Sequence, residues 1–136
     1  MNAQGAGPRI WWVPSIMTLL MVGLHALPGS DISVDSWWLV WHLDKLLHWL
    51  AFATWALTLN IAWAKARMFS STRRHLMWTA FSSLIFGTVL EVMQGAWMQD
   101  RMADPGDLMA DVAGGLFSLV LFQVIFRAWP GRIAHD

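Results

Sequence analysis

Several polar side chains recur at helical spacing in otherwise apolar parts of this sequence. Asp44 and His48 are four residues apart, Glu91 and Gln94 are three apart, and Asp107 and Asp111 are four apart. Residues three or four apart share one face of an α-helix, so each pair forms one stripe. Together with Lys45, Arg101 and Asp104 they form a set that we call the polar cluster: Asp44, Lys45, His48, Glu91, Gln94, Arg101, Asp104, Asp107 and Asp111.

The pair of Asp44 and His48 has the composition of a proton-handling or metal-binding site. A neighbouring carboxylate raises the basicity of an imidazole and fixes its tautomer. The same two side chains could instead serve only to hold neighbouring helices together. No H-x-x-x-H spacing indicates a dedicated zinc site, so we expect no metal ion here, and the sequence names no cofactor.

Glu91 is the strongest candidate for a functional acid or base in the cluster. Burial would raise the pKa of the Glu91 carboxyl, and a nearby cation such as Arg101 would lower it. The balance of the two effects decides whether Glu91 acts as an acid, as a base or as half of an ion pair. The alternative is a purely structural Glu91–Arg101 ion pair. Five carboxylates face only Lys45 and Arg101, a formal charge of −3. A proton, a divalent ion, or a cationic or sugar-amine group therefore fits the cluster better than an anion does.

Four apolar stretches must position these residues. Apolar residues make up 57% of the 136 positions and charged residues 13%, about half the roughly 25% that is usual in soluble domains. Each stretch is long enough to cross about 30 Å of hydrocarbon, which takes roughly 20 residues. We therefore predict one membrane domain over residues 1–136, an all-α bundle of four transmembrane helices at about 10–27, 43–63, 76–98 and 108–129.

The distribution of basic residues predicts the orientation of the bundle. With four spans, the N-terminus, the second loop and the C-terminus share one side, which holds seven of the nine Lys and Arg residues. The positive-inside rule then places both termini in the cytoplasm and the polar cluster at the external face. No basic run indicates a nucleic-acid partner, which leaves membrane lipids as the expected surroundings.

Small residues predict where the helices pack most closely. Ala110, Gly114 and Ser118 form a small-xxx-small row with Gly115 beside it, and Gly87 lies one turn before Glu91. Small residues let helix backbones approach one another in lipid, so we expect the third and fourth helices to pack tightly here. Two lone polar residues elsewhere, His25 and Asn60, are expected to make interhelical hydrogen bonds.

The ordered polar residues resemble those of a known family. The pattern runs Asp44-Lys45-x-x-His48, then Glu91-x-x-Gln94, then Arg101-x-x-Asp104-x-x-Asp107-x-x-x-Asp111-x-x-Gly114. It is similar to the VanZ-like family of small bacterial membrane proteins over residues 44–115 and the flanking helices. The resemblance implies the bacterial cytoplasmic (inner) membrane, a role at the cell envelope, and reduced susceptibility to teicoplanin-type glycopeptides. It implies no particular reaction.

Three functions are compatible with these residues. The first is an envelope protein whose external pocket binds a cell-wall precursor or another lipid-linked ligand. The second is an intramembrane enzyme acting on a lipid headgroup, with Glu91 or His48 as general base and Arg101 as electrostatic stabiliser. The third is a structural subunit that packs against another membrane protein.

Overall fold

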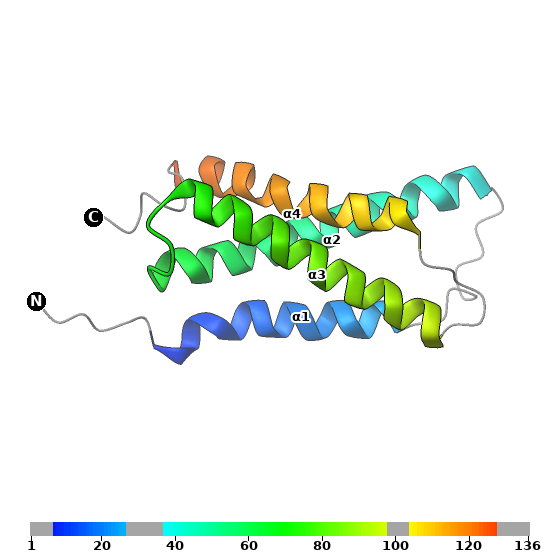
Figure 1. The fold of residues 1–136 in the computed structure, drawn as a ribbon, viewed down its shortest axis with the longest axis horizontal. Helices are drawn as coiled ribbons and strands as arrows, with labels where there is room; N and C mark the ends of the chain where they lie inside the picture. The colour runs from blue at the N-terminus through cyan, green and yellow to red at the C-terminus, as the bar shows by residue number, and fades with distance from the viewer. Residues whose placement is uncertain (1–6, 27–36, 98–103, 128–136) are drawn as a thin grey trace, which may run out of the picture.

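The computed structural model of the chain is all-α, as predicted (Figure 1). It describes residues 7–26, 37–97 and 104–127, excluding the side chains of 37–42 and 97. These parts hold a short 3-10 helix and four α-helices and contain no strand. The elements are η1 (Pro8–Trp11), α1 (Trp12–His25), α2 (Trp37–Lys65), α3 (Thr72–Trp97) and α4 (Pro105–Phe126).

Three of the helices are long and apolar enough to cross a membrane, which supports a multi-pass membrane protein. The spans are Leu43–Lys65, Thr72–Ala96 and Pro105–Phe126. The first predicted span differs, because α1 has only 14 residues, about 21 Å at the rise of an α-helix. Pro14 is the third residue of α1, where its missing N–H leaves no helical hydrogen bond unmade. The four residues before α1 form the 3-10 helix η1.

Helix boundaries depart from the predicted ones where capping residues lie outside the apolar runs. Thr72 begins α3 directly after Ser71, whose Oγ accepts a hydrogen bond from the Arg74 N–H. Pro105 begins α4 after Asp104, whose side chain accepts from the Gly106 N–H. A capping side chain followed by proline at the first helical position is a typical helix start. Both helices therefore begin before the apolar runs at 76 and 108.

Two adjacent glycines of α4 face different helices at close range. A Cβ at Gly114 would overlap the main-chain carbonyl oxygen of Trp49 on α2, whereas one at Gly115 would overlap the Ser83 hydroxyl on α3. A Cβ at Gly87 would lie 2.6 Å from the Asp111 carboxylate. Close packing of α3 and α4 is thus seen at Gly115 and Gly87. The expectation that Gly114 also faces α3 is wrong, because it faces α2.

Apolar and polar layers alternate inside the bundle. Phe52, Trp55 and Leu90 form a buried apolar core with Met21 and Ala56. The Trp55 indole N–H donates to the Thr18 hydroxyl at 2.9 Å, which joins α2 to α1.

The predicted interhelical role of Asn60 is confirmed. Its side-chain N–H donates to Ser118 Oγ at 3.0 Å, and its oxygen accepts from Thr79 Oγ1 at 2.9 Å. All three side chains are fully buried, so one amide links α2, α3 and α4. His25 donates to the Met21 carbonyl of its own helix, and its ring packs edge-on against His48 of α2 with centroids 4.9 Å apart. The interhelical hydrogen bond expected of His25 stays a prediction.

Candidate functional site

The polar cluster forms where the beginning of α4 meets the first half of α2 and the last third of α3. Eight of its nine predicted members fall within the described residues, and Arg101 lies outside them. Hydrogen bonds and ion pairs connect Asp44, Lys45, His48, Glu91, Asp104, Asp107 and Asp111. Gln94 is buried one turn beyond Glu91 on α3.

Lys45 connects α2 to the start of α4. Its ammonium donates to Asp104 Oδ2 at 2.5 Å and to Asp107 Oδ1 at 2.9 Å. Gly106 makes this approach possible, since a Cβ there would lie 2.7 Å from Lys45 Nζ. The ammonium, together with the Gly106 N–H, holds the pKa of the Asp104 carboxyl below its usual value. The lysine is therefore engaged by two carboxylates of the cluster itself.

Glu91 fixes the chain at the point where α4 begins. Its Oε2 accepts the main-chain N–H of Asp104 at 2.9 Å, and its side chain is buried, with 6% exposed. Its second oxygen, Oε1, is also buried and accepts no hydrogen bond from the part of the chain that the structure describes. The predicted Glu91–Arg101 ion pair lies outside the described residues.

His48 has a closer partner than the one that sequence spacing suggested. Its Nδ1–H donates to Asp111 Oδ1 at 2.9 Å, while its Nε2 lies 4.0 Å from Asp44 Oδ1. Asp111 is fully buried, and its Oδ2 accepts no hydrogen bond from the described residues. A carboxylate that accepts from one imidazole nitrogen fixes the tautomer, so the lone pair of neutral His48 is on Nε2, the ring nitrogen nearer Asp44.

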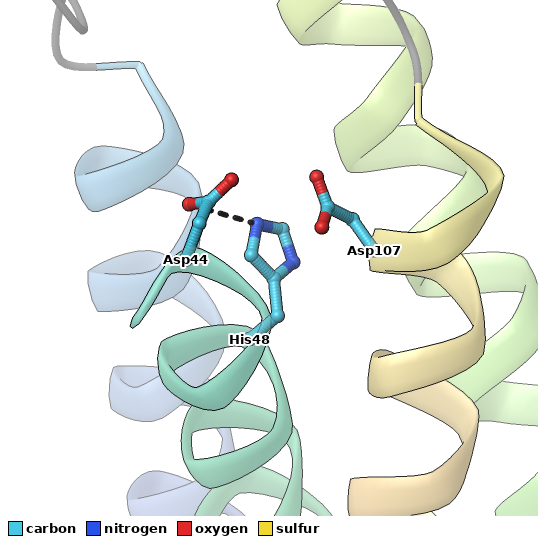
Figure 2. A group of neighbouring side chains, drawn as sticks. All are labelled: Asp44, His48 and Asp107. Atoms are coloured by element: carbon cyan, nitrogen blue, oxygen red, sulfur yellow. Dashed lines mark ion pairs between the residues drawn. The ribbon is translucent and has the colours of Figure 1, made fainter. Parts of the chain in front are cut away.

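Figure 2 shows three side chains of the cluster that could hold a metal ion. Asp44 and His48 come from α2 and Asp107 from α4, and one donor atom of each lies within 4.8 Å of the others. Zinc takes such ligands at about 2.0–2.2 Å, so the three side chains would have to close around the ion. The Lys45 ammonium already places a positive charge beside Asp107. The expectation that the cluster holds no metal ion stays a prediction.

A line of buried polar residues on α3 was not predicted from the sequence. His75, Thr79 and Ser83 are each fully buried and lie four residues apart, and the same register continues through Gly87 to Glu91. Thr79 belongs to the hydrogen bonds around Asn60. This four-residue repeat was the available signal: it marks the α3 face that packs inside the bundle.

Comparison of the chain with protein-family models, with curated proteins and with solved structures finds no match. The VanZ-like resemblance therefore rests on the ordered polar residues alone.

Proposed function

We propose that this chain is a cell-envelope protein of the bacterial inner membrane whose polar cluster binds a cell-wall or lipid-linked ligand through cationic or hydroxyl groups of that ligand. Binding of this kind would contribute to resistance to teicoplanin-type glycopeptides. One observation carries the proposal: among the described residues the cluster presents five carboxylates, and its lysine is already bonded to two of them.

The unused hydrogen-bonding capacity of the cluster defines the ligand chemistry. Glu91 Oε1 and Asp111 Oδ2 are buried acceptors without a donor among the described residues. A buried polar group left unpaired costs about 1–3 kcal/mol, so a donor supplied by a ligand recovers that free energy. An ammonium or hydroxyl group is such a donor. A phosphate would instead meet a surplus of carboxylates.

The acids of the cluster differ in their exposure. The side chains of Asp44 and Asp104 are 32% and 28% exposed, whereas Glu91 and Asp111 lie deeper. A cationic ligand would therefore meet Asp44 and Asp104 first.

The distribution of charge over the two ends of the bundle supports an external position for the cluster. All five described carboxylates belong to the cluster. Apart from Lys45, the described Lys and Arg residues lie at the other end of the bundle, in or beside η1, the end of α2, the beginning of α3 and the end of α4. They are Arg9, Lys65, Arg67, Arg73, Arg74 and Arg127. The positive-inside rule assigns this basic end to the cytoplasm, with both termini. It also requires a fourth span, for which η1 and α1 together supply about 29 Å of helix.

The resemblance to the VanZ-like family supports the same proposal from a separate direction. Several residues of the pattern that carries the resemblance contact one another in the fold. Lys45 bonds to Asp104 and Asp107, and His48 bonds to Asp111. Most of the polar residues of this pattern thus take part in contacts between helices in one region of the bundle.

Glu91→Gln tests the proposal in a glycopeptide-susceptible host that expresses the protein. The substitution keeps the size of the side chain and an acceptor for the Asp104 N–H, and it removes the negative charge. We expect the wild-type protein to raise the minimum inhibitory concentration of teicoplanin for this host. The Glu91→Gln variant should not raise it. Thr88→Ala is the matched control, because Thr88 is an exposed residue of the same helix whose hydroxyl bonds only to the Leu84 carbonyl. Full resistance in Glu91→Gln at equal membrane abundance would refute the proposal.

A second function is favoured by the His48–Asp111 hydrogen bond. A buried carboxylate orienting an imidazole is an arrangement that general bases use, and the 2.9 Å contact leaves Nε2 directed into the cluster. An enzyme acting on a lipid headgroup would release a product that mass spectrometry detects after incubation of the purified protein with membrane lipids. Loss of that product in His48→Gln would favour the enzyme over a binding protein.

A further inference from the structure

A groove is lined by residues from the beginning of α1, from η1 and from the end of α2. Figure 1 shows these segments at the end of the bundle opposite the beginning of α4, where the polar cluster lies. The volume of the groove is about 320 Å³. Ile10, Val13, Pro14 and Ile61 contribute apolar surface to its walls, and Arg9 and Lys65 are its two cations. The groove is therefore amphipathic, with positive charge added to an apolar surface.

The two cations lie at one end of this groove along the bundle axis. Lys65 is the last residue of α2, and Arg9 lies in η1, before α1 begins. The wall on α2 continues from Lys65 back to Thr58, about 10 Å along the helix. Both cations are exposed, and neither forms an ion pair with any residue that the structure describes.

We propose that this groove binds one anionic phospholipid, with the phosphate between Arg9 and Lys65 and an acyl chain along Val13 and Ile61. Its chemistry fits a molecule with an anionic head and an apolar tail. A free phosphate would leave the apolar wall uncovered, and a hydrocarbon chain alone would leave two cations without a partner. Basic pockets between transmembrane helices are a common place for anionic headgroups.

Neighbouring charges strengthen the preference for an anionic lipid. Arg67, Arg73 and Arg74 lie in or beside the α2–α3 connection at the same end of the bundle, and the described residues there include no carboxylate. A surface of this charge attracts an anionic leaflet, which raises the local concentration of the proposed lipid. This inference is independent of the function proposed for the polar cluster.

A lipid bound in this groove would link the beginning of α1 to the end of α2. Inside the bundle these helices are joined by the hydrogen bond from Trp55 to Thr18. A lipid bridging Arg9 and Lys65 would add a second junction close to where α1 begins.

Lipid retention by the purified full-length chain tests this site. Native mass spectrometry in a neutral detergent would compare phosphatidylglycerol with phosphatidylcholine of identical acyl chains. We expect preferential retention of phosphatidylglycerol, and a fall of about tenfold or more in that preference in the double variant Arg9→Gln/Lys65→Gln. The matched control is Arg73→Gln/Arg74→Gln, which removes two exposed cations from the same end without touching the groove.

A second variant tests the apolar half of the site without changing charge. Val13 is 57% exposed, so Val13→Trp would fill the groove without disturbing the buried core. We expect it to lower retention of phosphatidylglycerol as well. Equal retention of the two lipids by the wild type, or equal loss in the groove and control double variants, would overturn the proposal. So would a thermal shift by inorganic phosphate as large as that by the lipid, because the site would then bind only an ion.

Discussion

Replacing Gly114 with alanine should weaken the contact between α2 and α4 more than the same change at Gly106 or Gly115. The added Cβ would overlap the main-chain carbonyl oxygen of Trp49, which cannot rotate away, so the two helices would have to separate. Overpacking of this kind costs about 1–3 kcal/mol. Alanine regains up to about 1 kcal/mol over glycine through its helix propensity. Gly23→Ala in α1 is the control, because a Cβ there meets nothing within 4 Å and only the propensity gain applies.

The neighbouring glycine supplies a test that distinguishes backbone from side-chain overlap. Gly115→Ala would collide with the hydroxyl and Cβ of Ser83. Adding Ser83→Gly should therefore restore part of its stability, whereas no substitution at Trp49 should rescue Gly114→Ala. Unfolding in mixtures of mild detergent and sodium dodecyl sulfate, followed by circular dichroism, measures these differences. If Gly114→Ala is as stable as Gly23→Ala, the packing of α2 against α4 described above is wrong.

Three further predictions follow from the polar contacts. Asn60→Leu should destabilise the bundle by about 1–3 kcal/mol, measured by the same unfolding experiment, because Thr79 loses its acceptor inside the core. Lys45→Met should destabilise it by about 2–4 kcal/mol, since it leaves the mostly buried Asp107 unpaired, and Asp107→Asn in the same chain should recover much of that loss. Asp104→Asn keeps a helix-capping side chain but not the charge that Lys45 stabilises. Because the pKa of Asp104 is lowered in the fold, its contribution is complete above the usual value of 3.8 and is lost as pH falls through the lower, folded value. The difference in melting temperature between wild type and Asp104→Asn should therefore be constant near pH 6 and disappear in stronger acid.

Hydropathy and helical spacing predicted the features of this fold that depend on one helix at a time. They predicted the helical class, three of the four expected apolar spans, and the stripes formed by Glu91 with Gln94 and by Asp107 with Asp111, which are all buried. Capping signals were present in the sequence at Ser71 and at Asp104-Pro105, but apolar runs alone placed the helix starts too late.

Features that depend on the rotation of one helix against another could not be read from spacing. Adjacent helical residues differ in direction by about 100°, so Gly114 and Gly115 face different neighbours even though both lie in the same small-residue segment. The same reason explains His48. Spacing offered Asp44 on its own helix, whereas its close partner is Asp111 on α4, at a position fixed only by how α2 and α4 pack.

The fold gives a structural role to some carboxylate oxygens of the polar cluster and leaves two buried ones without a hydrogen bond from the described residues. Asp104 caps α4, and Asp107 lies in its first turn, where negative charge is favoured by the helix dipole. One oxygen of Glu91 accepts the Asp104 N–H, and one oxygen of Asp111 accepts from His48. The remaining oxygens, Glu91 Oε1 and Asp111 Oδ2, are buried and receive no donor from the described residues. In a membrane interior such acceptors are expensive to keep unless something binds them, so these two atoms are where we expect the ligand's ammonium or hydroxyl groups to bind.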